Sequence, residues 1–176
     1  MKKSLIICLA AACGLMSVSC KDNPAKDYEG IYNVKITPTL TLNNADQLPT
    51  IVSAVLNQNT INAATASVSD STYSCTVALD GDDGDVKVIM LGNVYKGHVD
   101  DKGLQLDNPM DYTVDYSVAK ITLHFNHSLI APVSDDADIN VLNWSASTSG
   151  DISIAGQNLS NCLTGTTKFL ATEIHN

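Results

Sequence analysis

The sequence contains no arginine, and glutamate supplies only two of its 19 acidic residues. Helix-rich proteins use Glu, Lys and Arg heavily, whereas Asp, Ser, Thr and Asn favour turns and caps. The missing arginine and the net charge of −9 argue against nucleic-acid binding, because phosphate recognition depends on Lys and Arg. Charged residues make up only 16% of the chain, so the composition is that of a turn-rich β protein.

The chain also lacks an apolar run long enough to cross a bilayer, which takes about 20 residues. Its longest run, residues 5–18, follows Lys2 and Lys3 and suits the apolar segment of a signal peptide. Ser17 and Ser19 are small residues at the expected cleavage region, and Cys20 follows them immediately. The sequence therefore predicts export.

This N-terminus resembles those of bacterial lipoproteins, in which the cysteine after the cleavage site carries the lipid. Ser17 replaces the leucine usual at that place, as in the relaxed motifs of Bacteroidetes-type lipoproteins. The resemblance implies a signal peptide over 1–19, fatty acid (palmitate) on Cys20, a tether over 20–27 and one domain over 28–176. It also implies a cell-envelope location, on the outer membrane. Alternatives are an ordinary secreted protein with a free Cys20, or lipidation at Cys13.

Two of the five cysteines, Cys75 and Cys162, then remain in the domain. In an exported protein they are a candidate disulfide, which would close a long loop. The alternative is two buried thiols. The chain has neither a CxxC pair nor zinc-ligand spacing.

Strict alternation of apolar and polar residues predicts strands along most of the domain. The first strand, residues 32–42, contains Pro38, which predicts an edge, a bulge or a split. Residues 73–79 and 86–90 flank an Asp/Gly-rich turn and predict a hairpin. A change of parity after Val118 predicts a bulge or a tight reversal. Further short strands are expected at 94–99, 104–106, 112–118, 121–125, 139–144, 152–154 and 166–174.

Helical spacing of apolar residues predicts one short helix near 46–57, and the small polar residues 63–71 predict a flexible connection. About eight to ten short strands with one helix indicate an all-β fold, either an antiparallel β-barrel or a β-sandwich. The opening Tyr28-Glu29-Gly30-Ile31-Tyr32 resembles the entry to the first strand of calycin-like (lipocalin-related) lipoproteins. That resemblance implies a small barrel formed by a strand meander.

No catalytic or cofactor motif is present, so we expect a non-catalytic protein without a cofactor. The Asp-rich segments 80–85 and 135–138 are interpreted as solvated turns, since neither follows the EF-hand pattern. His124 and His127 point to opposite faces of a strand and do not form a metal site. Ser71, within Asp70-Ser71-Thr72, resembles an O-glycosylation acceptor of exported Bacteroidetes proteins.

We expect a lipid-anchored binding module whose ligand is a small apolar molecule, a glycan or an envelope protein. Few bulky aromatic residues are available to fill a barrel, which favours a cavity. The alternative is a structural or adhesive β-sandwich without a cavity. The candidate ligand-lining residues, which share one parity on two strands, are Tyr32, Val34, Ile36, Tyr112, Val114 and Tyr116.

Overall fold

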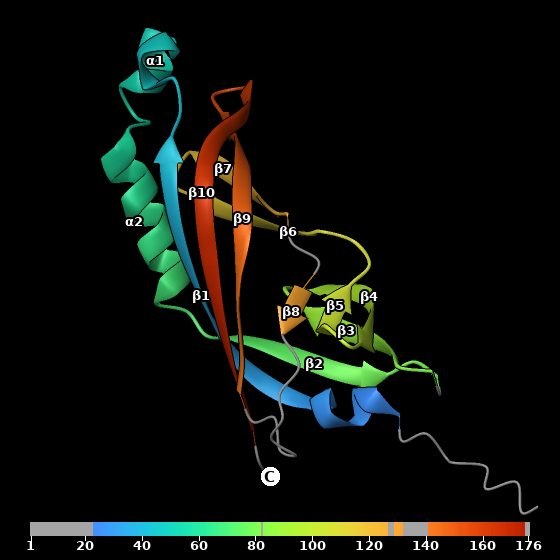
Figure 1. Cartoon of the computed structure of the whole chain (residues 1–176). Coiled ribbons are helices and arrows are strands. Elements are labelled where there is room, and N and C mark those ends of the chain that lie inside the picture. Colours follow the sequence, from blue (N-terminus) through green and yellow to red (C-terminus); the bar gives the residue numbers. More distant parts are fainter. Residues whose placement is uncertain (1–22, 82, 127–128, 132–140, 175–176) are drawn as a thin grey trace, which may run out of the picture.

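The computed structural model describes residues 23–81, 83–126, 129–131 and 141–174 (Figure 1). The strands are β1 (Gly30–Leu42), β2 (Tyr73–Leu79), β3 (Asp85–Met90), β4 (Asn93–Asp100), β5 (Gly103–Leu106), β6 (Met110–Tyr116), β7 (Ala119–Phe125), β8 (Leu129–Ala131), β9 (Val141–Ile154) and β10 (Gln157–Glu173). The α-helices are α1 (Thr50–Ser53) and α2 (Gln58–Ser69), and the 3-10 helices are η1 (Pro24–Tyr28) and η2 (Ala45–Gln47).

All ten strands belong to one antiparallel sheet, in the order β6-β7-β9-β10-β1-β2-β3-β4-β5-β8. Strands β1 to β5 form a meander, and β8, at one end of this order, also lies close to β9. The sheet therefore curls back on itself in a barrel-like shape (Figure 1). The all-β prediction is confirmed, and a single sheet decides for the barrel-like alternative over the sandwich.

Alternation along the strands builds the core, as the sequence predicts. On β1 the inner residues Tyr32, Val34 and Ile36 are fully buried. The lone tryptophan, Trp144, stacks on Phe169 with 4.7 Å between ring centroids, and Phe125 meets Phe169 edge-on. The tryptophan and both phenylalanines therefore pack together in one buried cluster.

Both predicted reversals are present as hairpins, of which the β6–β7 hairpin has the shorter turn. In the β2–β3 turn, the Asp80 amide donates to the Asp85 carbonyl at 2.8 Å. Tyr116 and Ala119 are the last pair between β6 and β7, which leaves a two-residue turn with Ser117 at φ 55°. This turn causes the change of parity, because it pairs even-numbered residues of β6 with odd-numbered residues of β7, and paired residues lie on the same face of the sheet.

The helical region differs from the prediction. Residues 46–57 contain only η2 and the single turn α1, whereas the main helix, α2, covers much of the segment predicted to be a flexible connection. The residues of α2 are mostly small and polar, with weak helix propensity. Burial of Ile61, Ala64 and Val68, at helical spacing on one face, stabilises the helix instead.

Two strand predictions also change. The segments 139–144 and 152–154 belong, where described, to the single 14-residue strand β9, because Ala146 and Thr148 continue the buried face between them. Pro38 causes neither a bulge nor a split, since it pairs with Thr167 in an unbroken register. The edge prediction is confirmed locally: past Val34, β1 no longer pairs with β2, and β10 is its only strand partner within the described part of the chain.

The folded domain begins before Tyr28, which corrects the predicted tether. Asn23 caps η1, Ala25 is completely buried, and the Tyr32 hydroxyl donates to the Tyr28 carbonyl at 2.9 Å. Residues 24–27 therefore pack on the sheet and do not form a free linker. Among the helices of the described residues, none is long and apolar enough to span a membrane.

Candidate functional site: a groove beside helix α2

Helix α2 is attached to the part of β1 that has no β2 partner. Its N-cap, Asn57, accepts a hydrogen bond from the Thr60 amide at 3.1 Å. The Gln58 side chain then accepts from the Leu42 amide and donates to the Leu40 carbonyl, both at 2.9 Å. This side-chain amide satisfies backbone groups that a neighbouring strand would otherwise satisfy. The start of α2 is thereby fixed to β1.

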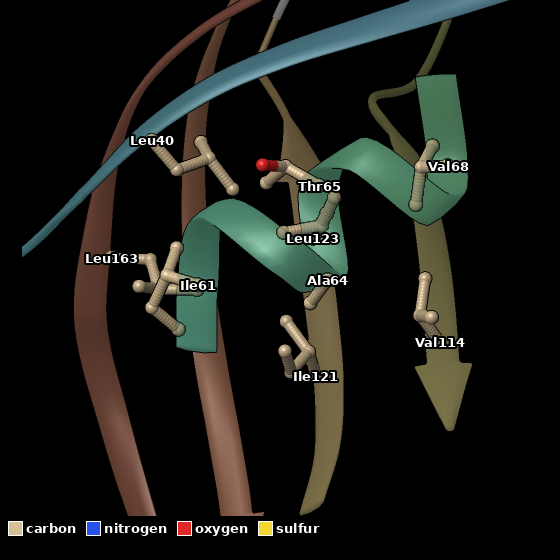
Figure 2. A pocket seen from close by; sticks show the side chains of 9 residues that line it. All are labelled: Leu40, Ile61, Ala64, Thr65, Val68, Val114, Ile121, Leu123 and Leu163. Atoms are coloured by element: carbon tan, nitrogen blue, oxygen red, sulfur yellow. The ribbon is translucent and has the colours of Figure 1, made fainter. Parts of the chain in front are cut away.

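The inner end of the groove lies between α2 and the concave face of the sheet (Figure 2). Ile61 and Ala64 of α2 face Ile121 and Leu123 of β7, with Val114 of β6 beside them. No charged side chain of the described residues lines this region, and its free volume is about 10 Å³, roughly that of one water probe. The inner end is therefore a narrow apolar seam between α2 and β7, and as it stands it is too small to hold a ligand molecule.

The outer end is a separate, open hollow of about 620 Å³, which shares no lining residue with the inner end. It lies between the start of α2, the Ser117-Val118 turn and the end of β9 at Ile154. Val118 is 69% exposed and Val55 is 46% exposed, and both line the hollow. Asn57 and Asn59 add neutral polar groups. This outer hollow, called here the groove mouth, is therefore lined by apolar and neutral polar side chains among the described residues.

Two tyrosines stand at the other end of α2. Tyr73 and Tyr112 meet edge-on with ring centroids 5.7 Å apart, and the Tyr112 hydroxyl lies 3.4 Å from that of Tyr73. The Tyr73 hydroxyl donates to the carbonyl of Val68, a groove residue. Burial, followed by the hydrogen bond to Tyr73, raises the pKa of Tyr112 to about 12. The Tyr112 hydroxyl is therefore neutral at physiological pH, and the pair joins β2, β6 and α2.

The two predicted sets of ligand-lining residues have different places. Val114 lines the inner groove and Tyr116 lines the mouth, while Tyr112 belongs to the tyrosine pair. Tyr32, Val34 and Ile36 share the inner face of the sheet, but they lie in its filled core and do not line the groove. The helical residues of the groove were missed because α2 was not predicted.

The two cysteines of the domain are free and buried, so the disulfide prediction is wrong and the alternative of two thiols is confirmed. Cys75 pairs with Tyr32 near the start of β1, whereas the Cys162 carbonyl accepts from Asn43, just past its end. The intervening β1 backbone is about 36 Å long at ~3.3 Å per residue, and a disulfide needs Cα atoms within ~7 Å. Burial raises the pKa of Cys75 to about 12, which makes its thiol unreactive.

A polar cluster lies on the outer face, away from the groove. His124 Nδ1 is 2.8 Å from Asp111 Oδ1, and its Nε2 is 3.4 Å from Asp151 Oδ2. The Asp111 hydrogen bond raises the pKa of His124 despite the opposing effect of desolvation. The imidazole thus connects three strands, β6, β7 and β9. It lies on an exposed sheet face beside other polar side chains and lines none of the groove.

The remaining polar motifs stay as surface features where they are described. Within the described residues, no group of His, Cys, Asp and Glu is arranged to hold a metal ion. Asp80, in the β2–β3 turn, forms an ion pair with Lys87. Ser71 is exposed in the turn after α2, with its hydroxyl donating to the Ser67 carbonyl at 3.0 Å. Cys20, His127 and the segment 135–138 lie outside the described residues.

No protein-family model, no curated protein and no solved structure matches this chain.

Proposed function

We propose that this protein is a lipid-anchored envelope protein whose domain binds a small, uncharged, apolar molecule in the groove beside α2. The observation that carries the proposal is the character of the lining: among the described residues, no charged side chain lines the inner or the outer end, and the inner end exposes only apolar surface. In a chain with 10 basic and 19 acidic residues, two neighbouring regions without a charged lining residue favour an apolar ligand.

The attachment of α2 suggests how such a molecule enters. Hydrogen bonds join the start of α2 to β1, while the apolar side chains of Ile61 and Ala64 face β7 across the inner groove. A ligand at the mouth meets Val55 and Val118 first, and it widens the seam by moving α2 away from β7. The apolar surface of the ligand then packs between Ile61 and Leu123, so both side chains stay shielded from water.

Binding is tested with residues 21–176, which contain every buried core residue. The probe is N-phenyl-1-naphthylamine, a neutral apolar dye that fluoresces on leaving water. We expect saturable fluorescence, reduced at least tenfold in affinity by Val114→Phe, which fills the groove from β6. Thr113→Phe, on the opposite face of the same strand, is the matched control and leaves binding unchanged.

Competition defines the ligand class. Decanol is expected to displace the dye at lower concentration than decanoate at pH 8, since a carboxylate finds no cation along the groove. Equal binding by the Val114→Phe chain refutes the groove as the site. Absence of any binding refutes the ligand hypothesis and leaves the structural or adhesive alternative.

The anchoring part of the proposal rests on Cys20 and the apolar segment before it. Two acyl chains on one cysteine hold a protein firmly, at about 0.8 kcal/mol for each buried CH₂. Cells given labelled fatty acid are expected to label the protein, and Cys20→Ala is expected to abolish the label. Continued labelling refutes this assignment, and loss of label in Cys13→Ala alone moves it to that residue.

A further inference from the structure

Exposed apolar side chains divide into two groups in the described part of the chain. Val55 and Val118 belong to the groove mouth. The other six lie together on or beside the outer face of β9, β10, β1, β3 and β4. These six, with Thr76, are called here the outer apolar face: Val141, Leu170, Ile174, Ile31, Ile89 and Val94.

The strand register places most of this face in one row across the sheet. Ile31 pairs with Thr76, Thr76 with Ile89, and Ile89 with Val94. On the other side, the Ile174 amide donates to the Ile31 carbonyl at 2.8 Å. The row therefore crosses five neighbouring chain segments, about 19 Å at the usual strand spacing. Val94 is 62% exposed and Ile31 is 46% exposed, so these apolar side chains are accessible at the surface of the domain.

Lysines border the row on both sides, although the chain as a whole is acidic. Lys35 pairs with Leu170, and Lys168 follows on the same face of β10. On the other side of the row, Lys87 pairs with Lys96 across β3 and β4. Four of the ten lysines thus surround one apolar strip, and Lys87 among them is ion-paired with Asp80, which leaves Lys35, Lys168 and Lys96 for the headgroups. Apolar side chains bordered by lysines are complementary to a bilayer surface that carries anionic headgroups.

The start of the folded domain lies close to this face. Asn23 donates to the Gly81 carbonyl in the β2–β3 turn, and η1 leads directly into β1 at Gly30, one residue before Ile31. If Cys20 carries the lipid, two residues lie between it and Asn23, and the three Cα-to-Cα steps reach at most about 11 Å. The anchor therefore holds Asn23, and with it this end of the barrel, within about 11 Å of the lipidated cysteine at the membrane surface.

We propose that the outer apolar face lies against the lipid bilayer, with Lys35, Lys168 and Lys96 at the headgroups. This inference rests on the anchoring proposed above, and it is independent of the groove. The groove mouth, formed by the start of α2, the β6–β7 turn and the end of β9, lies at the other end of the long strands, away from β2–β5 (Figure 1). It then faces away from the membrane and is open to ligand from the aqueous side.

The test uses the full-length lipidated protein in vesicles of phosphatidylethanolamine and phosphatidylglycerol, three to one. An environment-sensitive fluorophore is attached at Thr76→Cys, in the row, or at Thr113→Cys, on the outer face of β6. The native Cys75 and Cys162 are buried and do not compete for the label. Spin-labelled lipids are expected to quench the label at position 76 at least threefold more than the label at position 113.

A second pair of variants separates the face from the anchor. In Ile31→Ser/Val94→Ser protein, quenching at position 76 is expected to fall to the level seen at position 113, while fatty-acid labelling of Cys20 is unchanged. Equal quenching at both positions in the lipidated parent protein overturns the face and leaves the anchor intact. Protection of position 76 by a second copy, shown by crosslinking without lipid quenching, also overturns it. A chain without fatty acid overturns both.

Discussion

Truncating Ile61 to alanine tests how α2 is held and what its groove can bind. The side chain is 1% exposed and contacts the inner groove. The substitution removes three carbon atoms, about 2.4 kcal/mol at ~0.8 kcal/mol each. The cavity that remains adds to this loss, so we expect about 3 kcal/mol less stability, within the range found for buried Ile→Ala changes.

The same change enlarges the apolar seam, which a ligand can then fill. Binding stabilises a folded protein by about 2.7 kcal/mol when the free ligand is at 100 times its Kd. Decanol is therefore expected to restore most of the stability that Ile61→Ala loses. Ile36→Ala is the matched control, because Ile36 is equally buried but lies in the filled core on β1, outside the groove lining. Its loss should be similar and should not be restored.

The assay is urea unfolding of residues 21–176, followed by the fluorescence of Trp144, which is buried and stacked on Phe169. With a slope of about 2 kcal/mol per molar urea, a 3 kcal/mol loss moves the midpoint by roughly 1.5 M. A loss below about 1 kcal/mol would show that Ile61 does not hold α2 on the sheet. Equal rescue of both variants by decanol would show that binding occurs elsewhere.

Three further results are expected. A thiol reagent should detect two thiols in non-reduced, denatured residues 21–176, and it should react slowly with both in the native protein. Detection of no thiol would show that the disulfide is formed. Because the folded pKa of His124 is raised, its contribution to stability is present below the unfolded pKa of about 6.5 and is lost as pH rises through the folded value. His124→Gln should flatten this pH dependence of the unfolding free energy, whose amplitude is below about 1 kcal/mol for such an exposed cluster. If the variant has the same pH dependence as the parent protein, another group causes it. Gly165→Ala should unfold the chain or cost several kcal/mol, because the new Cβ overlaps the Thr39 carbonyl, whereas Gly156→Ala meets no atom and bears only the strain of its φ of +77°. Similar losses in both glycine variants would contradict the close approach of β10 to β1.

Local chemistry was sufficient for the strands and their turns. The alternation around Tyr32 and around Val114 identified the inner face of β1 and β6, because side chains of a strand alternate whatever its partners are. The Asp/Gly segment after Leu79 and the change of parity after Val118 predicted two hairpins, since turn conformations depend on a few adjacent residues.

Local chemistry was not sufficient for the helix. The sequence of α2 has weak intrinsic helix propensity, and its buried residues Ile61, Ala64 and Val68 are too sparse for a clear periodic signal. The helix is stabilised by β1, which no longer pairs with β2 after Val34 and accepts Gln58 in its place. That open position at the strand edge exists only once the sheet has formed.

The sequence by itself therefore determined the fold class and the inner parity of the strands, while export through residues 1–20 stays a prediction. Only the tertiary structure brought β10 beside β1, separated Cys75 from Cys162, and aligned Ile31 with Ile89 and Val94 in one exposed row. The physical reason is that strand neighbours and register are set by burial summed over the whole sheet, and no single segment carries that sum.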